Sequence, residues 1–288
     1  MLGFWAWTAP GWLPKLLIPW LILYLGTRHN AFAVQVHEAG HKLLFSGPCA
    51  NDAFCNFFGA YWILNDVESY RRVHLVHHTD LHLDTDPDLD LYRLPKSGHR
   101  FEIAQTLLRD LLWFTALRRI LDYARHPRSQ PQAAGSRQWL HLVAKLGSQV
   151  ILVGTAIVLL GWVQGSLFYL VFWVIPLFSV FPALIRLRIV TEHFSPDHYG
   201  AGEKPFVSRS TCTNGLEDYF LGCDMQFHFE HHLLPMIPHA QLARLHQALV
   251  AKDFFQPLPP ENDYLNSGYL RFWWRLLTGQ IHQRTLSL

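Results

Sequence analysis

The sequence has few charged residues and almost no excess of one sign of charge. Only 16% of its 288 residues are Asp, Glu, Lys or Arg, whereas soluble domains contain roughly 25%. The 24 Lys and Arg exceed the 22 Asp and Glu by two, which argues against a basic nucleic-acid-binding protein. There is no internal repeat, and 14% of the residues are aromatic. Collagen-like, coiled-coil and disordered chains are therefore excluded.

Cysteine is also scarce. The four cysteines, Cys49, Cys55, Cys212 and Cys223, form no CxxC pair, so we expect free thiols rather than a disulfide framework. The N-terminus lacks a basic segment and a small-residue cleavage site after a short apolar core. This pattern favours a retained anchor over a removed signal peptide.

Hydrophobic residues make up half of the sequence, and the mean hydropathy is +0.08. This value is high for a soluble enzyme and low for a bundle lying wholly in lipid. We therefore expect a few membrane spans that carry a sizeable polar part. A helix needs about 20 residues to cross the hydrocarbon core of a bilayer, and the predicted spans are residues 13–36, 142–163 and 167–187.

The last two spans are separated only by Gln164-Gly165-Ser166, which predicts a tight hairpin with both ends on one side of the membrane. Residues 46–140 contain eleven Lys and Arg, whereas the predicted tip contains none. By the positive-inside rule, we expect residues 46–140 and 188–288 to be cytoplasmic. The predicted fold is an all-α polytopic membrane protein. It forms a single domain over residues 1–288, with a few transmembrane helices capped by a cytoplasmic helical domain.

In residues 101–124, apolar residues alternate with charged ones such as Arg109, Asp110 and Arg118. This pattern fits a helix at the membrane interface, and it fits a helix packed on the cytoplasmic domain equally well. Residues 125–137, RHPRSQPQAAGSR, are predicted to be a polar linker.

Histidine is unusually common, with 18 residues against 22 acidic ones. HEAGH has two histidines at i and i+4, while HLVHH and HFEHH each have three at i, i+3 and i+4. On a helix these positions share a face, so their imidazoles can converge on a metal ion. A further histidine follows the last predicted span. The candidate metal ligands are His37, His41, His74, His77, His78, His193, His228, His231 and His232.

HEAGH also satisfies the HExxH pattern of zinc metalloproteases, but that interpretation leaves both HxxHH clusters unexplained. Eight or nine imidazoles exceed the needs of one ion, because a zinc site takes about four ligands. The number fits two metal ions that share the set in roughly equal halves. Imidazole binds iron, copper and zinc alike, so the ligands do not identify the metal.

The histidine clusters occur in a familiar order. HEAGH, HLVHHTDLHLDTDPD and, after two apolar segments, FHFEHHLLPMIPHAQLARLHQAL resemble the membrane fatty acid desaturase superfamily over residues 31–249. TEHF is similar to the additional histidine that this superfamily places after its last span. The three-residue gap in HEAGH is like that of acyl-lipid, sphingolipid and carotenoid-modifying members. The superfamily commonly has two spans before the first cluster, where this sequence offers one, and the haem-binding HPGG motif is missing.

The resemblance implies a histidine-box, non-heme di-iron oxidoreductase. Two iron ions, replaceable by zinc on overexpression, would use O2 and two external electrons to oxidise an unactivated C–H pair in a lipid chain. The electrons would come from a separate donor, either ferredoxin or a b-type cytochrome with its reductase. The expected reaction introduces a double bond into a fatty acyl chain or another lipid. A hydroxylase or ketolase of a lipid, carotenoid or hydrocarbon would use the same site and remains an alternative.

Several carboxylates near the clusters could accept hydrogen bonds from ligand imidazoles, as metal-bound histidines usually require. Solvated carboxylates and helix caps are equally good interpretations for any one of them. The candidates are Glu38, Glu192, Glu230, Asp84, Asp86 and Asp88. A membrane metal transporter is the remaining alternative. Transport sites place ionisable residues within the spans, whereas residues 142–184 contain only Lys145.

Overall fold

The computed structural model describes residues 1–93, 100–125, 135–193, 208–211, 213–223, 225–255 and 268–280. Within these ranges every regular element is helical, and one isolated bridge pairs Ser210 with Phe227. The all-α prediction is therefore confirmed for the described chain. Cys55, Cys49 and Cys223 are free thiols, as expected. Cys212 and most of the predicted linker at 125–137 lie outside the described residues.

The helices of the first half of the chain, with 3₁₀ helices marked η, are α1 (Leu2–Thr8), η1 (Leu13–Leu17), α2 (Ile18–Gly40), α3 (Pro48–Phe58), η2 (Ala60–Ile63), α4 (Val67–Asp80), α5 (Leu89–Tyr92), α6 (Arg100–Leu111) and α7 (Phe114–Arg125). In the second half, where η marks π-helical turns, they are α8 (Gly135–Leu160), α9 (Trp162–Tyr169), η3 (Leu170–Val174), η4 (Pro176–Val180), α10 (Phe181–His193), α11 (Gly215–Glu217), η5 (Asp218–Gly222), α12 (His228–Leu233), α13 (His239–Val250) and α14 (Tyr269–Leu277).

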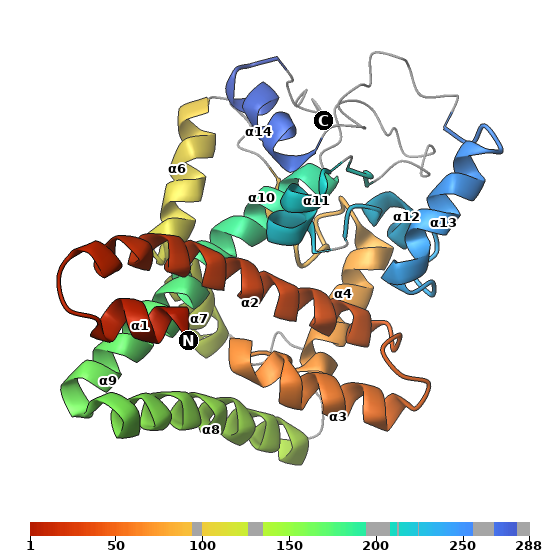
Figure 1. Cartoon of the computed structure of the whole chain (residues 1–288). Helices are drawn as coiled ribbons and strands as arrows, with labels where there is room; N and C mark the ends of the chain where they lie inside the picture. The colour runs from red at the N-terminus through yellow and green to blue at the C-terminus, as the bar shows by residue number, and fades with distance from the viewer. Residues whose placement is uncertain are drawn as a thin grey trace.

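Helix α2 runs through the middle of the molecule (Figure 1) and packs against α3, α4, α10 and η4. Around its second half, Val36 and Ala39 are buried together with Val67 of α4 and Leu177 of η4. Burying such side chains contributes about 1.5–3 kcal/mol each for residues of the size of Val and Leu. Helix α2 therefore has a well-packed C-terminal half, and this half carries the HEAGH cluster.

Helices α8 and α9 form the predicted hairpin, but its turn lies elsewhere. The chain reverses at Gly161, whose φ of 81° is a left-handed conformation that glycine adopts without strain. Gln164, Gly165 and Ser166, the expected tip, lie inside α9. A Cβ on Gly165 would come within 2.5 Å of the backbone of Ile157 in α8. This glycine therefore permits close helix packing and does not make the turn.

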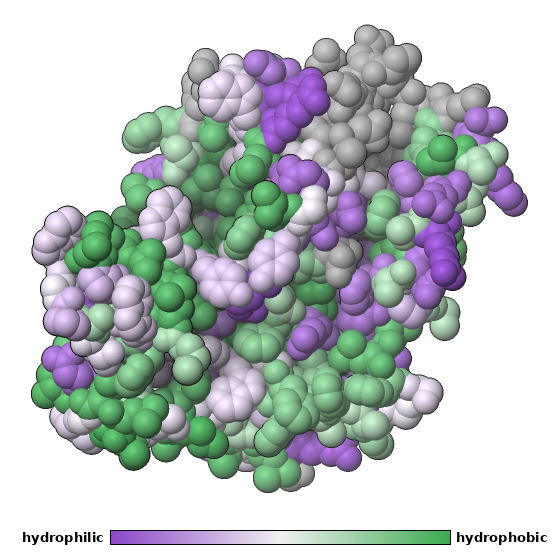
Figure 2. Space-filling model, viewed as in Figure 1, coloured by the Kyte–Doolittle hydropathy of each residue, from purple (hydrophilic) through white to green (hydrophobic). Residues whose placement is uncertain are grey.

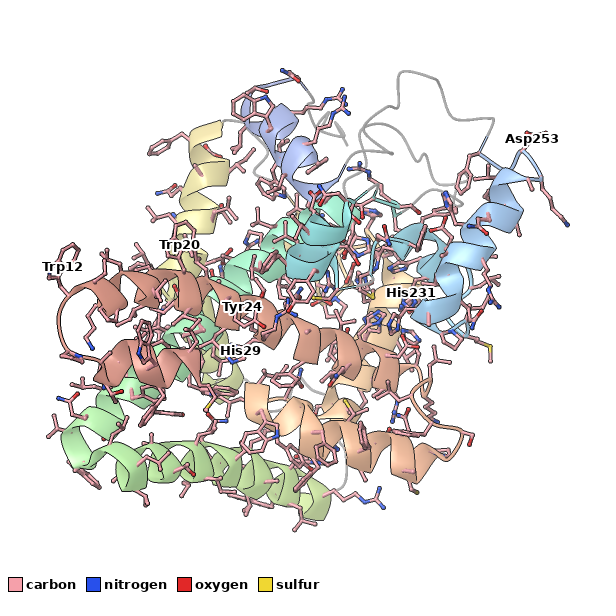
Figure 3. The ribbon with its side chains drawn as sticks, viewed as in Figure 1. Trp12, Trp20, Tyr24, His29, His231 and Asp253 are labelled. Atoms are coloured by element: carbon pink, nitrogen blue, oxygen red, sulfur yellow. The ribbon has the colours of Figure 1, made fainter. Side chains whose placement is uncertain are left out.

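Two helices of the described chain are long and apolar enough to cross a membrane: Arg137–Leu160, within α8, and Trp162–His193, which joins α9, η3, η4 and α10. Hydrophobic residues cover much of the surface over α8 and α9, whereas hydrophilic residues gather over α13 (Figure 2). Near the start of α2, Trp12 and Trp20 point outward (Figure 3) and are 72% and 70% exposed. The molecule thus has an apolar end and a polar end.

Residues 101–124 do not form the single helix that the sequence predicts. Helices α6 and α7 are separated at Trp113, whose φ of 69° is left-handed. Asp110, expected among the polar residues of an interfacial helix, is fully buried and forms an ion pair with Arg186 of α10. Arg186 also donates a hydrogen bond of 2.9 Å to the carbonyl of Leu91. The pair therefore ties α6 to α10 and to the segment that follows the second histidine cluster.

Candidate metal centre

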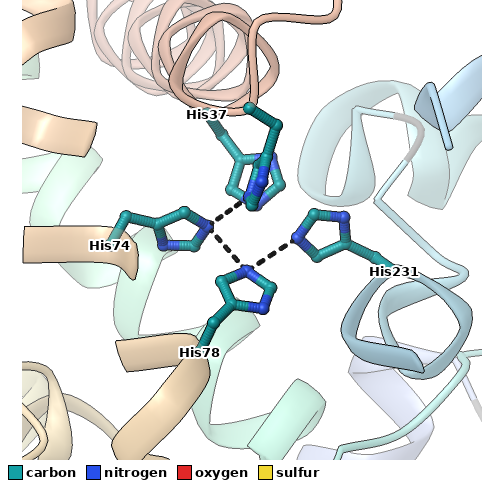
Figure 4. A group of neighbouring side chains, drawn as sticks. His37, His74, His78 and His231 are labelled. Atoms are coloured by element: carbon teal, nitrogen blue, oxygen red, sulfur yellow. Dashed lines mark hydrogen bonds between the residues drawn. The ribbon is translucent and has the colours of Figure 1, made fainter. Parts of the chain in front are cut away.

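Five histidines from three helices meet at one point. His37 and His41 come from the end of α2, His74 and His78 from α4, and His231 from α12, and we call them the five-histidine group. Each offers a ring nitrogen, and these nitrogens lie within 4.8 Å of one another. The Nε2 atom of His74 is 3.0 Å from that of His41 and 3.0 Å from that of His78, which in turn is 3.0 Å from that of His231 (Figure 4).

A second group of histidines lies beside the first. His77, His193 and His232 offer ring nitrogens within 4.8 Å of one another. The Nε2 atom of His228 is 3.0 Å from that of His193 and 3.1 Å from that of His232. We call these four residues the four-histidine group. The rings of His78 and His232 stack with their centroids 4.3 Å apart, so the two groups adjoin. The structure thus brings together all nine histidines that the sequence singles out.

Helix geometry explains how each HxxHH cluster contributes to both groups. Successive residues of an α-helix point about 100° apart, whereas residues four apart share a face. In both clusters the first and last histidines enter one group and the middle one enters the other. The middle residue of α4, His77, joins the four-histidine group, and the middle residue of α12, His231, joins the five-histidine group.

Arg71 of α4 holds the second cluster against the first. Its guanidinium donates to the carbonyls of Ala39 at 2.9 Å and Gly40 at 2.8 Å, and it also bonds Asp52 of α3 at 2.9 Å. The last carbonyls of a helix have no partner within the helix, so Arg71 satisfies two of them at the end of α2. This contact fixes α4 relative to the helix that carries His37.

Burial keeps the imidazoles neutral. It lowers the pKa of His41 to about 4 and the pKa of His78 to about 3. It also holds the pKa of His231 and of His232 well below the usual value, and neighbouring imidazoles add to the effect. Neutral imidazole is the form that binds a metal ion, so at pH 7 these side chains are in the binding state.

The arrangement of ring nitrogens fits metal ions. A neutral imidazole has one N–H and one lone pair. The Nε2 atoms of His74 and His78 each contact two other Nε2 atoms. Hydrogen bonds alone would therefore require each of them to use its single proton or lone pair twice. Both ring nitrogens of His37 are buried without a hydrogen-bond partner among the described residues, and such groups require an explanation. A metal ion that accepts the lone pair of each imidazole would satisfy one nitrogen of each ring, and imidazole suits both iron and zinc.

Asp86 supports one of these histidines directly. Its carboxylate accepts from Nδ1 of His77 at 3.0 and 3.1 Å, from the Tyr92 hydroxyl and from the backbone N–H of Asp88 at 2.9 Å. Burial alone would raise the pKa of Asp86, but the hydrogen bonds from His77 and Tyr92 bring it below its usual value. Of the acidic residues after the second cluster, Asp86 thus contacts a ligand candidate, while Asp84 pairs with an exposed arginine. The sequence did not single out Tyr92.

Glu192 lies beside the four-histidine group, close to His228. Its Oε1 accepts from the hydroxyl of Tyr269 at 3.0 Å and pairs with Arg188 Nε at 2.9 Å. Its Oε2 is 3.8 Å from Nδ1 of His228, and neither of these two buried atoms has a hydrogen bond within the described chain. Glu192 therefore faces His228.

Glu38 and Glu230 accept hydrogen bonds from histidines of α13 and not from ligand candidates. Nδ1 of His239 is 2.6 Å from Glu38, and Nδ1 of His246 is 2.6 Å from Glu230. The histidine clusters in the sequence do not include His239 and His246. Their signal was the spacing in PHAQLARLH, where two histidines seven positions apart share one face of a predicted helix.

The chain is similar to known proteins over most of its length. The family model described as fatty acid desaturase matches residues 10–280. Dihydrorhizobitoxine desaturase of Bradyrhizobium elkanii is 27% identical over 242 residues, which cover 77% of this chain and 64% of that protein. The sphingolipid delta(4)-desaturase of Komagataella phaffii is 28% identical over 247 residues, which cover 80% of this chain and 60% of that protein.

The sphingolipid delta(4)-desaturase of Candida albicans is 25% identical over 266 residues, which cover 86% of this chain and 64% of that protein. The matched region thus spans 60 to 64% of the length of these relatives.

Proposed function

The chain belongs to the fatty acid desaturase family, and from that premise we propose that it is a membrane oxidoreductase that introduces a double bond into a lipid chain. The observation that carries the proposal is the convergence of nine histidines in two adjoining groups. Desaturation is favoured over hydroxylation because the three similar proteins are named desaturases, two of them acting on sphingolipids.

We assign one iron ion to the five-histidine group and a second to the four-histidine group. When bound, the two ions would supply the redox chemistry that activates O2. The chain's own part is to hold nine imidazoles in fixed positions and to keep them from water. Asp86 contributes by accepting from Nδ1 of His77, which leaves the Nε2 lone pair of that ring free for a metal. Zinc would fill the same ligands on overexpression.

The proposed reaction removes two hydrogen atoms from adjacent carbons of the lipid. These two atoms, together with two electrons and two protons, convert one O2 into two water molecules. The electrons come from a separate donor, ferredoxin or a b-type cytochrome with its reductase. No side chain besides the metal ligands is assigned a catalytic role.

The proposed placement in the membrane follows from the apolar end of the molecule. We propose one domain over residues 1–288, with spans at 13–36, 142–160 and 162–187, the last two meeting at Gly161, and cytoplasmic parts at 46–140 and 188–288. The two long apolar helices and the Lys and Arg residues beyond them support this arrangement. The histidine groups would then lie on the cytoplasmic side, within reach of a soluble electron donor.

The test compares lipid extracts of cells that express the wild-type protein or His74→Ala, in a host supplied with candidate lipids. We expect a product lighter than its substrate by two hydrogen atoms in the wild type only, detected by mass spectrometry. A product heavier by one oxygen atom would show that the reaction is hydroxylation and not desaturation.

Metal content is the second readout of this test. Wild-type protein from iron-replete cells should contain two iron ions per chain. Protein that carries fewer than two metal ions after iron loading would contradict the two-ion assignment. Metal uptake into cells without any change in lipids would favour a transporter.

A further inference from the structure

Two buried glutamates lie between the ligand candidates and point away from them. Glu38 follows His37 on α2, and Glu230 precedes His231 on α12. They are 4% and 0% exposed. A residue next to a ligand on a helix points about 100° away from it. Both carboxylates therefore face outward from the five-histidine group, where each requires another partner, because a buried carboxylate without hydrogen bonds is costly.

Helix α13 supplies these partners from one face. Glu38 accepts from Nδ1 of His239 at 2.6 Å and lies 3.3 Å from the backbone nitrogen of the same residue, the first of α13. Glu230 accepts from Nδ1 of His246 at 2.6 Å and from the hydroxyl of Ser210. The two histidines are seven positions apart, which places them on one side of the helix. Leu242, between them on this side, is 0% exposed.

Helix α12 needs contacts with neighbouring elements to hold its position. It has only six residues, and helices this short are not stable on their own. Among the described helices, α12 packs most closely against α13 (Figure 1). By contrast, α4 is bonded to the end of α2 directly through Arg71. His231 lies on α12, and its ring centroid is 4.4 Å from that of His37 on α2. The distance between His37 and His231 therefore depends on the contacts that hold α12 beside α2.

We propose that α13 is a clamp that sets the position of α12 relative to α2, with His239 and His246 as positioning residues for the five-histidine group. The inference rests on the proposed function, because it assumes that this group binds a metal ion. Each histidine fixes a glutamate adjacent to a ligand candidate without touching the metal. The clamp joins segments about 190 residues apart in the sequence, Glu38 and Glu230.

The experiment titrates the full-length, metal-stripped protein in detergent with Co²⁺ against a competing chelator and follows the visible absorption of the bound ion. His41→Ala and His193→Ala serve as references that mark the signals of the five- and four-histidine groups. We expect His239→Ala to weaken Co²⁺ at the five-histidine group by about 10-fold, the lower end of the effect of supporting residues around metal ligands. The signal of the four-histidine group should stay at the wild-type affinity.

Rescue distinguishes positioning from a general loss of structure. In His239→Asn the side-chain amide keeps an N–H donor near the position of Nδ1, and we expect it to recover most of the affinity. His246→Ala tests the other contact independently and should weaken the same signal, with recovery in His246→Asn. If His239→Ala does not accumulate, the comparison of His246→Ala with His246→Asn tests the clamp.

His141→Ala is the matched control. His141 of α8 lies 3.5 Å from Glu68 and bonds Tyr61, so this change also removes a histidine–carboxylate contact, but one that does not join α12 to α2. We expect His141→Ala to bind Co²⁺ at both histidine groups with wild-type affinity. Wild-type affinity in both α13 alanine variants would overturn the clamp, as would an equal loss in His141→Ala. A wild-type chain that binds fewer than two Co²⁺ ions would instead contradict the proposed function.

Discussion

A shift of one position along a helix decides which metal group a histidine can join. His77 and His78 are neighbours in the sequence, yet His78 enters the five-histidine group and His77 the four-histidine group. The spacing of the clusters predicted eight of the nine candidates, because shared helix faces can be read from the sequence. It could not predict the division between the groups. That division depends on how four helices, distant in sequence, approach one another.

His193 is the residue for which the sequence alone is least informative, because it has no partner at helical spacing. In the structure it is 2% exposed, and its Nε2 lies 3.0 Å from that of His228. We predict that His193→Ala remains in the membrane, loses turnover and retains only the metal of the five-histidine group. Metal analysis and the lipid assay measure both effects.

The control for this change is His198→Ala, five residues on and outside the described part of the chain, which should retain both metals and full turnover. If the two variants have the same metal content and activity, His193 has a structural role and the site has eight ligands.

At the scale of helices, the sequence predicted which elements exist better than where they end. Both Gly161 and Gly165 could make the turn of the α8–α9 hairpin. The choice depends on contacts between the helices, because Gly165 is needed where the backbone of α8 approaches closely. The break between α6 and α7 was missed for a similar reason. Asp110 looks like a surface residue in the sequence, but the ion pair with Arg186 makes its burial possible.

The hairpin provides a test of sidedness. Trp162, directly after the turn, is 75% exposed, and the proposed topology puts it on the outer side of the membrane. In a variant with Cys49→Ser, a cysteine introduced by Trp162→Cys should react with an impermeant maleimide added to intact cells. Gln241→Cys, on α13 beside the histidine groups, should react only after permeabilisation. The reverse pattern would place the histidines outside and overturn the proposed topology.

Over the whole molecule, buried imidazoles at the polar end make the stability of the fold sensitive to acid. Six of the nine candidate ligands are at most 4% exposed, namely His37, His74, His77, His193, His228 and His231. An unfolded chain binds protons at its histidines near pH 6.5. In the folded protein, burial lowers the pKa of His41 to about 4 and of His78 to about 3. Between these values the unfolded state therefore binds more protons than the folded state.

This difference in bound protons fixes how the free energy of unfolding changes with pH. Because the unfolded state binds the extra protons, the free energy of unfolding falls as the pH falls from 6.5 towards 4. Above pH 6.5 these histidines are neutral in both states, so they add no pH dependence to the free energy of unfolding. We predict that the melting temperature of the metal-free protein in detergent stays level from pH 8 to about 6.5 and then drops with acidification. His78→Asn removes one buried imidazole that resists protonation, so its melting temperature should drop less steeply. A melting temperature that rises on acidification, or an equally steep drop in His78→Asn, would show that neutral buried histidines do not set the acid stability of this protein.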